Sequence, residues 1–275
     1  MCYGDNTASI KIDITQASVG PYTYDLFGTD YLNQQYTQTA NNINNLTYTF
    51  NSIPAGEYQV KVTDANGSSK TSQTRVITQP NAPITITSSI SDYGSYNISC
   101  FGANDASINL SIQGGTLSGN NFYQYQWTTN NGSGLDINSL NQTGLGPGDY
   151  TILVTDENNC TLTETYSIIS PEALNYVLDE KKNITCKDDA DGSIQISVSG
   201  GSGNYNYNWT TVNGTGLVQG QQDQTGLGPG IYSLILSDGC ESIQYEYLIS
   251  EPDELTITLD EKTDIKVIAL SLIHI

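Results

Sequence analysis

A unit that recurs three times along the chain constrains its fold more than any other feature. Each copy ends on a proline, and these closing residues, Pro80, Pro171 and Pro252, lie 91 and 81 residues apart. The parts of the unit keep their order: a cysteine turn, a Gly-Gly or Gly-Pro turn, alternating aromatic residues, a glycine turn and a tyrosine. An internal repeat of this length predicts a tandem array of small domains.

Each copy predicts an all-β domain. After the cysteine turn, apolar residues alternate with polar ones, as at Ile108, Leu110 and Ile112, which is the period of a strand with one buried face. An aromatic strand with Tyr125 and Trp127 follows in the same copy. Short strands at this spacing, about seven per copy, are typical of immunoglobulin-like Greek-key β-sandwiches. We therefore expect such sandwiches in a linear array, joined by short Pro-containing links.

The repeat boundaries divide the chain into three repeats and the start of a fourth. In order, these are residues 1–82 (repeat 1), 83–172 (repeat 2), 173–254 (repeat 3) and 255–269. Repeat 1 lacks the segment that precedes the first cysteine of the other copies, and 255–259 resembles the start of repeat 3 at 174–178, so we expect a fragment of a longer chain. Residues 270–275 match no part of the repeat. We interpret them as a translated sequencing adapter and exclude them from fold reasoning.

Five aromatic side chains are predicted to form the structural core. In each repeat a tyrosine lies two residues after the glycine turn, which is similar to the tyrosine corner of immunoglobulin-like sandwiches. Each tryptophan shares a strand face with a tyrosine, and Leu26 replaces it in repeat 1, which favours core packing over a sugar-stacking platform. The predicted core residues are Tyr58, Tyr150, Tyr232, Trp127 and Trp209.

Composition argues against several classes of function. The net charge of −20 makes nucleic acid and anionic membrane poor partners. No run of about 20 apolar residues is present, so no membrane insertion is expected. The only histidine, His274, lies in the excluded tail, so no Ser-His-Asp or Cys-His nucleophile can be built. We therefore predict that the chain is not an enzyme.

The acidic turn of repeat 3 is a weak calcium candidate. Asp188, Asp189 and Asp191 follow one another closely, as the ligands of a calcium loop do. However, Lys187 occupies the place of the first ligand, which favours a plain Asp/Gly turn. We expect no other cofactor, and zinc is disfavoured because there is no Cys-x-x-Cys motif.

The five cysteines recur at fixed places in the repeat, which indicates disulfides and an oxidising compartment. One pairing joins cysteines within a repeat, Cys100 to Cys160 and Cys186 to Cys240, and leaves Cys2 unpaired. The other joins neighbouring repeats, Cys2 to Cys160 and Cys100 to Cys240. A first strand of about seven residues would separate the within-repeat partners by roughly 23 Å, beyond disulfide reach. We favour pairing within repeats, on the assumption that this strand is irregular.

The order of the motifs resembles the SprB-type repeats of very large cell-surface adhesins of gliding and related Bacteroidetes. The motifs are Cys-x-Gly, Gly-Gly, Tyr-x-Tyr-x-Trp, Gly-x-Tyr, Val-Thr-Asp and Gln/Glu-Pro, and the resemblance covers residues 2–254. Repeat 1 departs at Leu26 and at Ser68, which replaces the second cysteine. The resemblance implies export to the outer cell surface by the type IX secretion route, and a role in cell adhesion or gliding motility.

We therefore predict a non-catalytic stalk segment of a secreted, extracellular adhesin. The alternative is an accessory spacer or carbohydrate-binding module array of a secreted polysaccharide-degrading enzyme. A third hypothesis places glycan binding in the variable loops 128–141 and 210–224. The expected partners are neighbouring repeats of the same chain and cell-surface or extracellular glycans.

Overall fold

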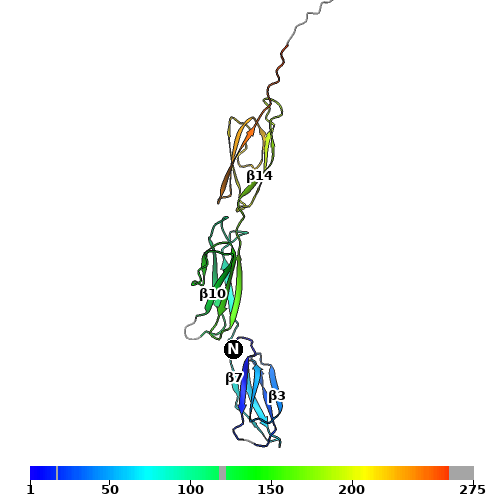
Figure 1. Cartoon of the computed structure of the whole chain (residues 1–275), viewed down its shortest axis with the longest axis vertical. Helices are drawn as coiled ribbons and strands as arrows, with labels where there is room; N and C mark the ends of the chain where they lie inside the picture. Colours follow the sequence, from blue (N-terminus) through cyan, green and yellow to red (C-terminus); the bar gives the residue numbers. More distant parts are fainter. Residues whose placement is uncertain (17, 118–121, 260–275) are drawn as a thin grey trace, which may run out of the picture. The chain divides into compact units, whose positions relative to one another are not determined.

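The computed structural model describes residues 1–16, 18–117 and 122–259. The regular secondary structure within these residues consists of β-strands, β1 to β19 (Figure 1). Three separate hydrophobic cores form, one within each predicted repeat. By internal contacts the chain divides into two compact units, the first being Met1–Pro171 and the second beginning at Glu172. The suspected tail 270–275 lies outside the described residues.

Repeat 2 is an antiparallel β-sandwich of two three-stranded sheets. One sheet has the order β8-β9-β11 and the other the order β10-β12-β13. These are the A-B-E and C-F-G strands of the immunoglobulin fold, and the described residues of this repeat contain no strand D. The strands are β8 (Thr85–Ile90), β9 (Ala106–Gln113), β10 (Gln124–Asn130), β11 (Gln142–Leu145), β12 (Gly148–Thr155) and β13 (Thr161–Ile168).

Repeat 3 has the same topology. Its sheets have the orders β14-β15-β17 and β16-β18-β19, and all pairs are antiparallel. The strands are β14 (Asn175–Lys182), β15 (Gly192–Ser199), β16 (Asn206–Val212), β17 (Gln224–Leu227), β18 (Gly230–Ser237) and β19 (Ser242–Ile249). The all-β, immunoglobulin-like fold predicted from the repeat is confirmed by this strand order.

Repeat 1 is a variant of this sandwich. In the described residues, β1 pairs with β4 alone, whereas β9 and β15 each pair with two strands. The strand β3 extends the other sheet beside β2, and the last strand is divided into β6 and β7, which both pair with β5. The strands are β1 (Ala8–Asp13), β2 (Tyr22–Asp30), β3 (Gln35–Ile43), β4 (Thr47–Ile53), β5 (Gly56–Thr63), β6 (Ser69–Thr71) and β7 (Arg75–Ile77).

The last glycine of each glycine turn has a backbone conformation that other residues rarely adopt. Gly148 has a φ of +147°, and a Cβ atom placed there would lie 2.5 Å from the Cα of Gly132. Gly56 and Gly230 have φ values of +155° and +159°. The turn therefore needs glycine, because it brings two backbone segments into contact at a point where the chain enters the next strand.

The tyrosine after each glycine turn lies in the core. Tyr58, Tyr150 and Tyr232 are at most 1% exposed. In repeat 2 the Tyr150 hydroxyl oxygen lies 2.8 Å from the carbonyl oxygen of Gly146, four residues upstream. This is the geometry of a tyrosine corner, in which the hydroxyl ties the start of strand F to the preceding turn.

The tryptophans of repeats 2 and 3 are also buried. Trp127 and Trp209 are 2% and 0% exposed, and Leu26 at the same position of repeat 1 is 1% exposed. The indole N–H of Trp127 donates to the carbonyl of Leu140 at 3.2 Å, and that of Trp209 to the carbonyl of Gln221 at 2.9 Å. Burial leaves neither ring face available for stacking on a sugar.

Candidate functional site

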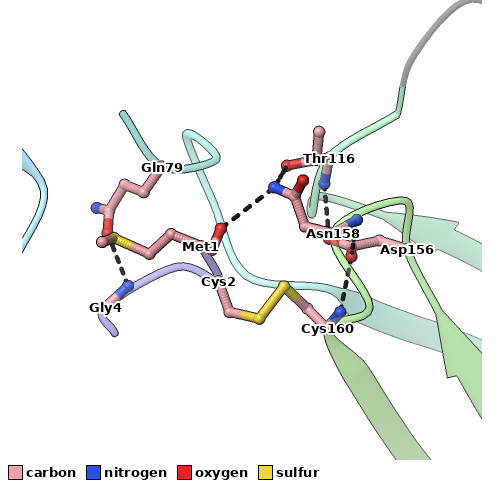
Figure 2. Close-up of a disulfide and its surroundings, with 8 residues drawn as sticks. All are labelled: Met1, Cys2, Gly4, Gln79, Thr116, Asp156, Asn158 and Cys160. Carbon is pink, nitrogen blue, oxygen red and sulfur yellow. Dashed lines mark hydrogen bonds between the residues drawn. A yellow bond between two sulfur atoms is a disulfide. The ribbon is translucent and has the colours of Figure 1, made fainter. Parts of the chain in front are cut away.

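The hairpin between β12 and β13 is organised by a buried carboxylate. Asp156 is 4% exposed, and its Oδ1 accepts hydrogen bonds from the backbone N–H of Asn158 (2.9 Å) and of Cys160 (2.8 Å). Its Oδ2 accepts a hydrogen bond, 2.8 Å long, from the N–H of Thr116. Thr116 lies just after the Gly-Gly turn. Figure 2 shows these bonds around one carboxylate. They hold the backbone of Cys160 in a fixed position.

Cys160 forms a disulfide with Cys2, so repeats 1 and 2 are joined covalently (Figure 2). The two Cα atoms lie 5.5 Å apart although 158 residues separate them in the sequence. Cys2 packs against the hydrophobic core of repeat 2. Beside the bond, the side-chain amide of Asn158 donates to the carbonyl of Met1 at 3.2 Å and to the hydroxyl of Thr116 at 2.8 Å.

A further hydrogen bond ties the first turn of repeat 1 to the end of the same repeat. The N–H of Gly4 donates to the Oε1 of Gln79 at 2.8 Å, and Gln79 directly precedes the closing proline Pro80. The segment that carries Cys2 is therefore held at two places, by the hairpin of repeat 2 and by the last residues of repeat 1. The junction is a defined site rather than a single flexible cross-link.

The pairing of cysteines within repeats, which we favoured from sequence, is wrong. Cys160 bonds to Cys2 rather than to Cys100, and Cys186 is an exposed free thiol, so no bond joins it to Cys240. Cys100 and Cys240 are both disulfide-bonded. The odd thiol is therefore Cys186 and not Cys2.

Pairing within a repeat fails because its two cysteines lie at opposite ends of the sandwich. The N–H of Asn97 donates to the carbonyl of Ile169 at 2.9 Å, which places the segment leading to Cys100 near the end of β13. Cys160 precedes the first residue of that strand, Thr161. A strand of about eight residues spans roughly 26 Å, so the two cysteines of one repeat lie beyond disulfide reach. In repeat 2 the assumption of an irregular first strand fails, because β8 pairs regularly with β9 from Thr85 to Ile90. In repeat 3 the first strand β14 pairs with β15 along its length, with one register shift between Leu178 and Glu180.

A buried aspartate serves the hairpin of repeat 3 in the same way. Asp238 is 6% exposed and accepts from the N–H groups of Cys240 (3.0 Å), Glu241 (2.8 Å) and Ser202 (2.7 Å). Burial raises the pKa of Asp238, but these backbone donors outweigh it and the net shift is downward. The role of this aspartate was not predicted from the sequence. Its recurrence at Asp64, Asp156 and Asp238 was the available signal.

The weak calcium candidate is a hydrogen-bonded turn. Asp191 accepts from the N–H of Thr185 at 2.9 Å, from the hydroxyl of Thr185 and from the Nζ of Lys182 at 3.3 Å. The hydrogen bonds from Thr185, aided by Lys182, lower the pKa of Asp191 to about 2. Over residues 1–16, 18–117 and 122–259, no group of three or more His, Cys, Asp or Glu side chains is placed to hold a metal ion, so Asp188 and Asp189 do not complete a site.

Buried glutamines fix the variable loops of repeats 2 and 3. Gln142, at the start of β11, is fully buried, and its Oε1 accepts from the N–H of Asp136 at 2.9 Å. Its Nε2 donates to the carbonyls of Asp136 (2.8 Å) and Ser139 (2.6 Å). In repeat 3, Gln224 makes the corresponding bonds to the backbone of Val218. This role was not predicted from the sequence, because a glutamine in a polar loop carries no distinguishing pattern.

The part of the chain that the structure describes contains no helix long and apolar enough to cross a membrane.

Comparison with known proteins gives one family match. Residues 95–132 and 178–214 match the family model described as SprB repeat. These segments run from the cysteine turn through the aromatic strand of repeats 2 and 3. No curated protein matches the chain.

Several solved structures resemble the chain weakly. Extracellular domains 3–5 of Drosophila OTK cover 90% of this chain and 93% of theirs, with 9% identity and a TM-score of 0.30. The insect immune protein hemolin covers 90% of this chain and 72% of its own, with 12% identity and a TM-score of 0.29. Scores this low carry no argument, and the fold assignment rests on the strand order.

Proposed function

Because the chain carries SprB-type repeats, we propose that it is a non-catalytic stalk segment of a secreted cell-surface adhesin. The observation that carries the proposal is the Cys2–Cys160 bond, which joins two successive sandwiches covalently. A bond at this place adds nothing to a binding pocket or a catalytic group. It is suited to a chain whose task is to keep successive domains connected under load.

The chemistry of the surface and of the cysteines supports an extracellular location. Disulfides persist in oxidising compartments, and four of the five cysteines are disulfide-bonded. The net charge of −20 favours solubility and disfavours contact with nucleic acid or anionic lipid. More specifically, we propose that the chain is exported by the type IX route and acts in adhesion or gliding motility. Neighbouring repeats and surface glycans are its proposed partners.

Labelling of intact cells of the organism that encodes the chain tests the proposal. An antibody raised against residues 1–259 should label cells without permeabilisation, and external protease should remove the signal. Deletion of the repeats from the gene should reduce attachment to surfaces. A signal that needs permeabilisation would contradict the proposal. Normal attachment together with lost polysaccharide degradation would favour an accessory module of an enzyme instead.

A further inference from the structure

The outer edge of strand C is covered by a neighbouring strand in repeat 1. The C strands of the three repeats are β2, β10 and β16, and each pairs on its inner side with strand F of its own repeat. In repeat 1, Leu26 of β2 lies opposite Val60 of β5 on one side and opposite Gln38 of β3 on the other. The outer edge of strand C therefore accepts an antiparallel strand, which pairs with its outward N–H and carbonyl groups.

In repeat 3 one side chain replaces that covering strand. Trp209 of β16 has the position of Leu26, and its backbone N–H donates to the Oε1 of Gln219 at 3.3 Å. The Nε2 of Gln219 donates in turn to the carbonyl of Trp209. A single amide thus makes both hydrogen bonds that a neighbouring strand would make to this residue. Because Trp209 lies in the middle of β16, the amide closes the edge at its centre.

Repeat 2 leaves the same edge open. Ile137 follows Trp127 at the distance at which Gln219 follows the tryptophan of repeat 3. An isoleucine side chain has no donor or acceptor, and Ile137 is 65% exposed. Among the described residues, β10 (Figure 1) pairs with β12 alone, and no other group hydrogen-bonds to the outward N–H or carbonyl of Trp127.

We propose that the open edge of β10 binds the same edge of a second copy, as an antiparallel strand pair. The two copies leave identical donors and acceptors unpaired, so each strand completes the other about a two-fold axis. The residues of β10, Gln-Tyr-Gln-Trp-Thr-Thr-Asn, carry no charge. Two chains with a net charge of −20 therefore bring no like charges opposite each other in these strands.

The register follows from the backbone groups that point outward. Alternate residues of an antiparallel strand direct these groups to the same side, so Tyr125 and Thr129 face outward together with Trp127. All three pair with one another across the joint only when Trp127 of one copy lies opposite Trp127 of the other. On the exposed face of the sheet, this register places Gln126 opposite Thr128.

Sedimentation equilibrium of the full chain measures the contact. The chain should carry Cys186→Ser, which excludes disulfide formation through the free thiol. Because two identical surfaces meet, the weight-average mass should rise with concentration from that of one copy toward that of two and stop there. The measurement needs only a second copy, so its result does not depend on the stalk proposal.

Ile137→Gln supplies repeat 2 with the residue that closes the edge in repeat 3. We expect about a tenfold weaker association, because the second copy must then displace two hydrogen bonds. Ile137 is exposed, so the change does not threaten folding.

Two double variants test the register. Gln126→Glu with Thr128→Glu sets like charges opposite each other at two symmetric places across the joint. Gln126→Lys with Thr128→Glu sets opposite charges at the same places. The first should weaken association and the second should strengthen it, so that their dissociation constants differ by about tenfold.

The equivalent residues of repeat 3 provide the matched control. Asn208 and Thr210 are exposed on β16, whose edge Gln219 closes, so the same two pairs of substitutions there should leave association unchanged. A mass independent of concentration would overturn the proposal and leave the edge of β10 to a strand of another protein. Equal effects of the two double variants of β10 would also overturn it, as would association that Ile137→Gln does not weaken.

Discussion

The hydroxyl of Tyr150 lies within hydrogen-bond distance of three backbone groups, whereas that of Tyr58 has one distant neighbour. The Tyr150 oxygen is 2.7 Å from the carbonyl of Ser133 and 2.8 Å from that of Gly146, and it accepts from the N–H of Ser133 at 3.0 Å. The Tyr58 hydroxyl is 3.4 Å from the carbonyl of Ala55. The same residue at the same place in the repeat therefore ties a loop in repeat 2 and contributes mainly its ring in repeat 1.

Removal of these hydroxyls should destabilise the two repeats unequally. Tyr150→Phe removes the hydroxyl that accepts from the N–H of Ser133 and lies beside the carbonyl of the buried Gly146, and should lower the unfolding free energy of repeat 2 by about 1–3 kcal/mol. Tyr58→Phe is the matched control and should cost repeat 1 less than about 1 kcal/mol. Hydrogen exchange across a urea series resolves the repeats. Equal losses of unfolding free energy in the two variants would show that the hydrogen bonds of the Tyr150 hydroxyl do not stabilise repeat 2.

The pKa of Tyr58 predicts a loss of stability at alkaline pH. Burial, together with the charges of Asp30 and Tyr36, raises this pKa to about 12, from 10.0 in the unfolded chain. Between these values the unfolded state releases a proton that the folded state keeps. The unfolding free energy of repeat 1 should therefore be unaffected by this group below pH 10 and fall above it, by up to about 1.4 kcal/mol per pH unit.

Thermal melts between pH 8 and 12 test this expectation. Tyr58→Phe should make the alkaline decline of repeat 1 shallower without removing it, because burial also raises the pKa of Tyr24. An unchanged slope in the variant would show that Tyr58 does not contribute to the decline.

At the scale of elements, the sequence predicted the strands with clear alternation and missed those without it. The period of two at Ile108, Leu110 and Ile112 corresponds to β9. The polar connection after the aromatic strand gave no such period, and it proves to be the strand β3 in repeat 1 but a loop in repeats 2 and 3. The contacts of Gln142 determine that loop, and they depend on tertiary structure.

Gln142→Leu should therefore destabilise repeat 2 strongly although it places an apolar residue in a core. The substitution removes the partner of the Asp136 N–H and of the Ser139 carbonyl, while the Asp136 carbonyl keeps the N–H of Ser139, and it should cost about 2–4 kcal/mol. Trp127 fluorescence in urea reports the change, because the indole donates to Leu140 in the same loop. Gln126→Leu on the exposed face of β10 is the control and should change stability by less than about 0.5 kcal/mol. A similar cost at both positions would contradict this role of Gln142.

The choice between the two cysteine pairings depends on the distance between the two ends of a sandwich, which the sequence alone does not determine. Placing Cys100 and Cys160 at opposite ends of a sandwich was sound, since β8 and β9 pair without a break. The choice of pairing failed because the alternation of β8, which reads Thr-Ile-Thr-Ser-Ser-Ile, was too weak to exclude an irregular strand. Because β8 is in fact a regular strand, Cys100 and Cys160 are too far apart to bond, and Cys160 bonds to Cys2 of the neighbouring repeat.

At the scale of the whole molecule, the Cys2–Cys160 bond changes which part of the chain bears a pulling force. In an unlinked array, force applied at the two ends passes through every sandwich and unfolds each in turn. With the bond in place, the load passes from Cys2 to Cys160 through sulfur, and residues 3–159 need not extend. A stalk built in this way keeps its length even when the strands of repeat 1 separate.

Single-molecule stretching of the full chain, held at its two ends, measures this effect directly. The bond closes a loop of 158 residues, which at about 3.3–3.6 Å per residue corresponds to a contour length of roughly 520–570 Å. The oxidised chain should therefore reach a final length at least that much shorter than the reduced chain. Cys2→Ser should lengthen the oxidised chain, whereas Cys186→Ser, which removes the free thiol, should leave its length unchanged. Equal final lengths for oxidised and reduced chains would mean that no disulfide bypasses the sandwiches, and the mechanical basis of the stalk proposal would be lost.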